Sequence, residues 1–250
     1  MKTCSRLSLT VLLVLWTVSN LHAQVYPNAK TGGNYMHNYY FPPAASSTPW
    51  WPSWSPDGQW IAFAMDGSIW KARVGESTAY EIIYAKEYLS SPEWSPDGKW
   101  IAYTADDDSK SINLMLFSIE TGKSAALTTG NFENLEPAWS PDGKRLAYVS
   151  TEAGGWFNIL VMDINNGVKG KVTRITTDHK FGRDRLYFSD NDIHISPTWS
   201  PDGKELIFIS DRDIPLGSGA IWRAPVEFDV MQSGKAKVIH KEEMLYRTRS

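Results

Sequence analysis

The chain has 250 residues, with 25 Lys and Arg against 28 Asp and Glu, one cysteine, 12 Trp, 11 Tyr and 9 Phe. This length suffices for one large domain, and the aromatic and apolar content excludes a disordered chain. Because Lys and Arg supply most of the affinity for phosphate, a slightly acidic chain without a basic stripe is not expected to bind nucleic acid. The same lack of a basic face disfavours attachment to a membrane surface.

Residues 1–23 have the order of a secretory signal peptide. Lys2 and Arg6 precede the apolar stretch 7–18, and Leu21-His22-Ala23 is a plausible cleavage site. The stretch is shorter than the roughly 20 residues that a bilayer span needs. We therefore expect a periplasmic or secreted protein with no membrane insertion after signal cleavage. Cys4 precedes the apolar stretch, so neither a lipid anchor nor a disulfide is expected in the mature chain.

One motif occurs four times after residue 50. The sequence Pro-x-Trp-Ser-Pro-Asp-Gly returns with its tryptophans 40, 45 and 60 residues apart. Ser-Pro-Asp-Gly predicts a tight turn, because Pro presets φ and Gly accepts the left-handed conformation. The aspartates are expected to bond backbone within their own turns rather than to bind metal. The repeated residues are Trp54, Asp57, Gly58, Trp94, Asp97, Gly98, Trp139, Asp142, Gly143, Trp199, Asp202 and Gly203.

Each motif is followed by three more predicted strands. The run after each turn is apolar without alternation, as in 60–63, which indicates a strand covered on both faces. Third strands are expected at 69–72, 114–117, 159–162 and 221–224, and fourth strands at 80–84, 124–128, 172–176 and 235–240. Thr121-Gly122 and Asn166-Gly167 mark turns between them. Four short antiparallel strands per unit predict an all-β fold, a β-propeller of four four-stranded blades at about 50–89, 90–130, 135–178 and 195–243. Each motif tryptophan should be buried between blades.

The motif also carries a family resemblance. The sequence Trp94–Tyr103 resembles the blade repeat of TolB-type β-propellers, and the resemblance covers residues 50–250. It implies the fold and says little about function. More narrowly, residues 32–40 and 182–188 resemble the propeller part of exported amidohydrolase-related proteins, in which a metal-dependent hydrolase domain follows the propeller.

The repeat suggests an incomplete ring. Residues 244–250 resemble the first strand of a fifth blade, and TolB-type rings are usually larger than four blades. Residues 24–49, rich in Tyr, Pro and Ser, look like a clasp or linker. We expect the chain to be the front part of a longer polypeptide, and residues 24–250 alone to expose apolar surface and to aggregate or bind a hydrophobic dye.

No catalytic, metal-binding or cofactor-binding residue is assigned. No two of the mature histidines, His37, His179, His194 and His240, stand at the His-x-His spacing of an amidohydrolase. Residues 217–219 are only a fragment of a nucleophile elbow, and no phosphate or dinucleotide loop occurs. Residues 106–108 should form a solvated turn. Residues 190–192 lack the pattern of a calcium loop and should be hydrated.

Two long connections mark a candidate binding patch. The connection from Thr177 to Pro197 is twelve residues longer than that from Thr129 to Pro137, and residues 211–219 also form a long connection. Long loops in repeat folds are often functional, and strand alternation places both loops on the face opposite the Ser-Pro-Asp-Gly turns. The candidate ligand- or partner-binding residues are Arg183, Arg185, Tyr187, Asp190, Asp192, His194, Asp211 and Arg212. In the alternative interpretation, 183–185 makes only internal ion pairs.

Two functions fit these observations. The first is an exported, non-catalytic module without a cofactor, which binds a protein, a peptide or an appended catalytic domain. The alternative is the N-terminal propeller part of a larger exported metal-dependent hydrolase whose catalytic domain is not on this chain. A coding sequence that continues past Ser250 into a domain with His-x-His would favour the second.

Overall fold

Four antiparallel sheets of four strands make up the computed structural model, which describes residues 48–107, 111–180, 191–212 and 219–241. Every element assigned in these ranges is a strand, which confirms the predicted all-β, four-bladed fold. The strands are β1 (Trp50–Trp54), β2 (Trp60–Met65), β3 (Ser68–Arg73) and β4 (Ala79–Ile83) in blade one; β5 (Tyr88–Trp94), β6 (Trp100–Asp106), β7 (Ile112–Ser118) and β8 (Ser124–Ala126) in blade two; β9 (Asn134–Trp139), β10 (Arg145–Ser150), β11 (Asn158–Asn165) and β12 (Val168–Arg174) in blade three; and β13 (His194–Trp199), β14 (Glu205–Ser210), β15 (Ala220–Pro225) and β16 (Lys237–Lys241) in blade four.

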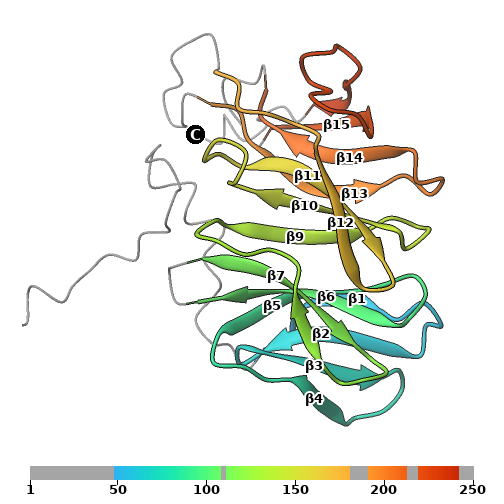
Figure 1. Cartoon of the computed structure of the whole chain (residues 1–250). Coiled ribbons are helices and arrows are strands. Elements are labelled where there is room, and N and C mark those ends of the chain that lie inside the picture. The colour runs from blue at the N-terminus through green and yellow to red at the C-terminus, as the bar shows by residue number, and fades with distance from the viewer. Residues whose placement is uncertain (1–47, 108–110, 181–190, 213–218, 242–250) are drawn as a thin grey trace, which may run out of the picture.

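The blades follow one another in chain order (Figure 1). The first strand of each blade is innermost, because β1, β5, β9 and β13 contact one another in succession. Within the described ranges β13 does not contact β1, so the four blades form an open arc of a propeller. We call the side with the Ser-Pro-Asp-Gly turns the turn face. The opposite side, with the second-to-third-strand turns and the blade-to-blade connections, is the loop face.

The Ser-Pro-Asp-Gly turns are closed by their own side chains. In the first copy, Gly58 has a φ of 67° and donates its N–H to the carbonyl of Ser55 at 2.9 Å. The carboxylate of Asp57 accepts the Ser55 hydroxyl at 2.5 Å and the Gln59 N–H at 3.0 Å. The Ser55 hydroxyl holds the pKa of Asp57 below its usual value. The other three turns repeat these bonds, so all four motif carboxylates serve their own turns.

The junctions between blades bury three of the four motif tryptophans. Trp94, Trp139 and Trp199 are 7 or 8% exposed. The indole N–H of Trp139 donates to the carbonyl of Glu93 at 3.2 Å, and that of Trp199 to the carbonyl of Ala138 at 3.0 Å. The rings of Trp139 and Trp199 therefore join their blades to the inner strand of the preceding blade.

Trp54 departs from this pattern. Its side chain is 57% exposed, so the expectation that all four motif tryptophans are buried is wrong for this one. The physical reason is that burial of the ring needs a preceding blade, and no strand of the described residues lies before blade one.

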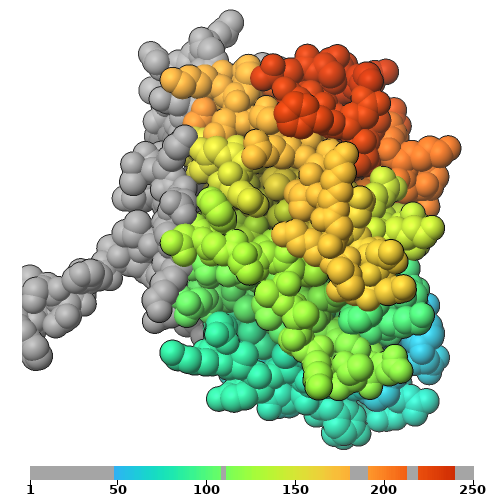
Figure 2. Space-filling model, viewed as in Figure 1, coloured from blue at the N-terminus to red at the C-terminus, as the bar shows by residue number. Residues whose placement is uncertain are grey.

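An outer hairpin adds a second contact between blades two and three. The turn that joins β11 to β12 reaches blade two, where a Cβ on Gly167 would lie 2.3 Å from the Trp100 ring. In the space-filling view, the gold segment of this hairpin lies against the green surface of blade two (Figure 2). The contact covers one side of Trp100 and leaves that residue half-buried.

Candidate functional site

The loop face is held together by bonds between its two kinds of connection. The N–H of Leu89, which enters blade two, donates to the carbonyl of Gly67 in the β2–β3 turn at 2.9 Å. The N–H of Ile193, which enters blade four, donates to the Asp211 carboxylate at 2.8 Å. The long connection into blade four and the long β14–β15 connection are therefore neighbours, joined by a buried carboxylate.

The long connection into blade four starts from a buried polar clamp. The side-chain amide of Asn158 donates to the Asp178 carboxylate at 2.7 Å, and its carbonyl oxygen accepts the Thr176 hydroxyl at 3.0 Å. Asp178 lies directly on Gly154, where a Cβ would be 1.9 Å from the carboxylate oxygen. Only a glycine at position 154 leaves room for this carboxylate.

The two ends of the same connection are joined to each other. The His179 ring nitrogen Nδ1 lies 3.1 Å from the Asp192 carboxylate, and the Asp192 N–H donates to the His179 carbonyl at 2.9 Å. Lys180 and Asn191 add an antiparallel bridge. We call residues 178–180 and 191–193 the neck. Because Asp192 is 1% exposed, the neck contains a carboxylate that is almost completely removed from water.

The eight predicted patch residues divide into two groups. Four of them, Arg183, Arg185, Tyr187 and Asp190, lie outside the described residues. The other four hold the loops in place: Asp192 and Asp211 form the contacts above, His194 is 0% exposed with its ring 6.2 Å from that of Phe208, and Arg212 is half-buried with its N–H bonded to the Ser210 hydroxyl. Among the described residues of the neck, Lys180 is exposed, and Asp178, His179 and Asn191 are half-buried.

A second feature is repeated in the innermost strands β1, β5, β9 and β13, which we call the channel wall. In all four innermost strands the residue before the proline has a positive φ, at 51° to 55°, and strand pairing is irregular there. Residues before proline rarely adopt this conformation, so each is a strained bulge. The bulges were not predicted from the sequence, although a proline two residues before each motif tryptophan was a visible signal. The four bulge residues are Trp51, Ser91, Glu136 and Ser196.

Two glutamates of the channel wall are partly desolvated. Glu136 accepts the N–H of the next bulge residue, Ser196, at 2.6 Å, and burial raises the pKa of Glu136 although this bond opposes the shift. Burial also raises the pKa of Glu93 to about 7. The innermost strands therefore present carboxyl groups rather than basic side chains along this wall.

A buried acidic position was also missed. Asp106 is only 5% exposed, so the expectation of a solvated turn is wrong for this residue; it ends β6 and pairs with both Tyr88 and Ile112. Glu133, between β8 and β9, is 1% exposed. Burial and the nearby Asp106 charge raise the pKa of Glu133 to about 8.

The described ranges contain no group of three or more His, Cys, Asp or Glu side chains placed to hold a metal ion. They also contain no helix with the length and apolarity of a bilayer span. Among the described residues, the features that remain as candidates for binding are the neck, on the loop face, and the channel wall.

Comparisons with known proteins agree with this architecture. No curated protein sequence matches the chain. The structure is similar to that of the putative TolB from Agrobacterium tumefaciens, with 25% sequence identity, a TM-score of 0.59 and coverage of 78% of this chain and 63% of that one. It is also similar to TolB from Acinetobacter baumannii, with 20% identity, a TM-score of 0.58 and coverage of 79% and 45%.

A third similar structure belongs to an enzyme. The puromycin-hydrolysing peptidase of Mycobacterium tuberculosis is 15% identical, with a TM-score of 0.50 and coverage of 73% of this chain and 29% of that one. At this identity the likeness concerns the fold alone. The chain spans less than two thirds of the length of each of these three proteins.

The sequence itself gives the family. A profile described as the TolB beta propeller domain matches residues 75–243, which is more than half of the chain. This match includes three of the four motif copies, and the structure arranges all four as consecutive blades. The chain belongs to the TolB β-propeller family.

Proposed function

We propose that this chain is an exported propeller module that binds a protein or a peptide on its loop face. The observation that carries the proposal is the neck. A surface connection that only links two blades needs no buried carboxylates, because a carboxylate removed from water is costly unless it is bonded. Here Asp192 and Asp211 are buried and Asp178 is half-buried, and the bonds of all three carboxylates fix one long connection.

The location outside the cytoplasm rests on the sequence. Residues 1–23 have the pattern of a signal peptide. We infer that the protein is exported and works in the periplasm or outside the cell.

Site-specific cross-linking tests the binding face. A photoreactive residue at Lys180, in the neck, should capture a protein partner in the exporting cell. The same residue at Lys204, on the turn face, should not. Both positions are exposed, so the comparison is matched for accessibility. Equal capture at the two positions would contradict the proposal.

A charge-reversal variant tests the two arginines of the predicted patch. The double substitution Arg183→Glu and Arg185→Glu should abolish the capture at Lys180 while the urea midpoint of unfolding stays unchanged. The matched control is Lys99→Glu with Lys144→Glu, two exposed positions on the turn face. Retained capture together with a large loss of stability would show that the arginines make internal ion pairs only.

A second candidate follows from the peptidase comparison. There the matched region is only 29% of the peptidase chain, so a fold of this type occurs within a larger enzyme. On this alternative, the chain is the propeller part of a larger exported hydrolase. The coding sequence downstream of Ser250 tests it: a domain with His-x-His supports the hydrolase, and a stop codon directly after Ser250 favours the separate module.

A further inference from the structure

The outer hairpin of blade three has a chemically distinctive pair of residues in its turn. Asn166 and Gly167 form the two-residue connection between β11 and β12. The residues on either side of them, Asn165 and Val168, are paired across the hairpin. Both turn residues have a positive φ, 47° and 77°, as in the tight hairpin turns that favour Asn-Gly. Asn166 is the only asparagine of the chain that is followed by glycine.

The glycine of this turn is held against the neighbouring blade. A Cβ on Gly167 would lie 2.3 to 2.8 Å from three atoms of the Trp100 ring, so the bare backbone contacts the indole directly. In the corresponding turns of the other three blades, a Cβ on Gly75, Gly122 or Gly234 would meet nothing within 4 Å. Among the described third-to-fourth-strand turns, this one is therefore distinguished by a ring packed on its glycine.

The asparagine of the turn is open to water. Asn166 is exposed, whereas Gly167 is half-buried. An asparagine side chain can react with the backbone nitrogen of the next residue to form a five-membered imide. A glycine at that next position hinders the reaction least, because it has no Cβ beside the nitrogen. The sequence and the exposure therefore make Asn166 the most reactive amide among the described asparagines.

The reaction balances with water alone. The Gly167 nitrogen loses its proton to the solvent and attacks Cγ of Asn166. The new N–Cγ bond forms, the Cγ–Nδ2 bond breaks, and Nδ2 takes up a proton and leaves as ammonia. Water then opens the imide. Its addition at Cγ gives aspartate, and its addition at the backbone carbonyl gives isoaspartate, in which the main chain runs through Cβ and Cγ.

The closed hairpin opposes this reaction. To reach Cγ, the Gly167 nitrogen has to rotate about the Cα–C bond of Asn166, which moves the glycine away from the Trp100 ring. The turn must therefore open before the imide can form. When opening is fast and reversible, the rate of such a reaction follows the population of the open form. A contact that keeps the turn closed slows the reaction in proportion.

We propose that Asn166 is a site of spontaneous deamidation to isoaspartate, and that Trp100 sets the rate by holding the turn closed. Isoaspartate puts one extra main-chain atom into a two-residue turn, so the strand pairing and the contact between Gly167 and Trp100 are no longer compatible. Because the ammonia is lost, the asparagine is not regenerated. The outer contact between blades two and three is thus lost in one direction. This inference is independent of the proposed function.

Peptide mapping of the aged protein tests the site. After incubation of the purified chain in mildly alkaline buffer, isoaspartate should accumulate at Asn166 at least about tenfold faster than at Asn165. Asn165 is the matched control because it is exposed in the same hairpin but is not followed by glycine. Enzymatic methylation of isoaspartate measures both positions, and Asn166→Gln should remove the signal. No isoaspartate at Asn166, or equal amounts at the two positions, would overturn the proposal.

A tryptophan substitution tests the control of the rate. Trp100→Ala should speed the reaction at Asn166 about tenfold, which corresponds to a turn that is easier to open by about 1.4 kcal/mol. The matched control is Trp60→Ala, which removes the corresponding ring at the start of β2 and should leave the rate unchanged. Trp100→Leu should act in the same direction if the alanine variant does not fold. A wild-type rate in a folded Trp100 variant would show that the ring does not hold the turn.

The reaction product tests the structural consequence. The isoaspartate form, separated from the aged chain by ion exchange, should have a lower urea midpoint of unfolding than freshly purified Asn166→Asp. The two forms have the same charge and differ only in the path of the main chain, so the comparison isolates the extra atom. Equal midpoints would mean that the contact between Gly167 and Trp100 survives the change, against the proposal.

Discussion

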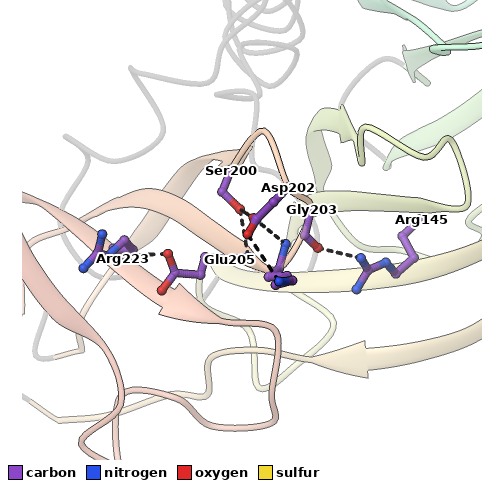
Figure 3. Close-up of polar contacts among 7 residues, drawn as sticks. Arg145, Ser200, Asp202, Gly203, Glu205 and Arg223 are labelled. Atoms are coloured by element: carbon purple, nitrogen blue, oxygen red, sulfur yellow. Dashed lines mark hydrogen bonds and ion pairs between the residues drawn. The ribbon is translucent and has the colours of Figure 1, made fainter.

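The guanidinium group of Arg145 in blade three lies over the indole of Trp199 in blade four, with the Arg145 Cζ 4.5 Å from the ring centroid. The same guanidinium donates from Nη2 to the carbonyl of Gly203 at 2.7 Å (Figure 3). One side chain thus contacts both the tryptophan and the glycine of the next motif. Figure 3 also shows Arg223 paired with Glu205, at 3.6 Å, within blade four.

This arrangement predicts unequal effects of two arginine substitutions. Arg145→Ala should lower the free energy of unfolding by about 1–3 kcal/mol, because it removes a cation–π contact and a charged hydrogen bond between blades. Arg223→Ala should cost less than about 1 kcal/mol, because its ion pair is exposed and lies within one blade. Urea denaturation measures both. Equal losses would show that the inter-blade contact adds nothing.

The tryptophans of the junctions should differ in the same way. Trp94→Ala should cost about 3–5 kcal/mol, because it empties a buried space between blades one and two. Trp54→Ala should cost far less, because the side chain is 57% exposed. Thermal and urea unfolding of both variants test this. An unchanged midpoint for Trp94→Ala, with the loss of some binding activity instead, would assign the ring to a ligand.

The buried carboxyl group of Glu133 makes the free energy of unfolding depend on pH. Its pKa in the folded chain, about 8, exceeds the ordinary value of 4.5, so the folded state holds a proton that the unfolded state releases between these values. The contribution of Glu133 to the free energy of unfolding is therefore greatest below pH 4.5 and falls as the pH rises toward 8, by at most about 1.4 kcal/mol per pH unit. Glu93, with a pKa raised to about 7, acts in the same direction.

The variant Glu133→Gln isolates this contribution. The slope of unfolding free energy against pH between 5 and 8 should become shallower, and the remaining slope should come from other groups such as Glu93. The control is Glu152→Gln, because Glu152 is exposed. If urea titrations at several pH values gave the same slope for wild type and Glu133→Gln, the buried carboxyl would not be protonated in the folded chain.

Two hairpin glycines form a natural pair for testing the outer contact. Gly122 and Gly167 occupy corresponding turns with φ of 66° and 77°, but a Cβ would meet nothing at Gly122 and the Trp100 ring at 2.3 Å at Gly167. Both alanine variants place a Cβ on a residue in the left-handed conformation. This lowers the free energy of unfolding by about 1–2 kcal/mol. Gly167→Ala should lower the free energy of unfolding by roughly a further 1–3 kcal/mol, because the new Cβ displaces the Trp100 ring. Equal urea midpoints would mean that the hairpin moves away without cost.

The repeat and the four blades could be predicted from the sequence, because the strands and turns of each blade are determined by residues close together in the chain. Turn residues, apolar runs and motif spacing all depend on neighbours in the chain, and the predicted third strands at 69–72 and 159–162 lie within β3 and β11. The exposure of Trp54 could not be derived in this way, since burial of the motif tryptophan depends on a preceding blade rather than on the motif. The burial of Asp106 likewise depends on its pairing with Tyr88 and Ile112.

The candidate site was less accessible to sequence reasoning. The length of the loop indicated the connection between blades three and four as a candidate site. It did not indicate that Asp192 and Asp211 fix this connection from within. The same residue types would suit a binding surface and a buried clamp, and only their three-dimensional neighbours distinguish the two. The bulges before the prolines were also missed, because the expected conformation of a residue before proline is extended.

The bulged prolines also affect what the channel can accept. The innermost strand of each blade has one side without a strand partner, and such a free edge is a template on which any extended polypeptide can add as a further strand. Pro52, Pro92, Pro137 and Pro197 lack the N–H that this pairing requires, and the adjoining residues with positive φ interrupt the regular spacing of the other groups. A segment that enters the channel therefore has to be held through side chains, which protects these strands from unspecific sheet extension and leaves recognition to the residues that line the wall.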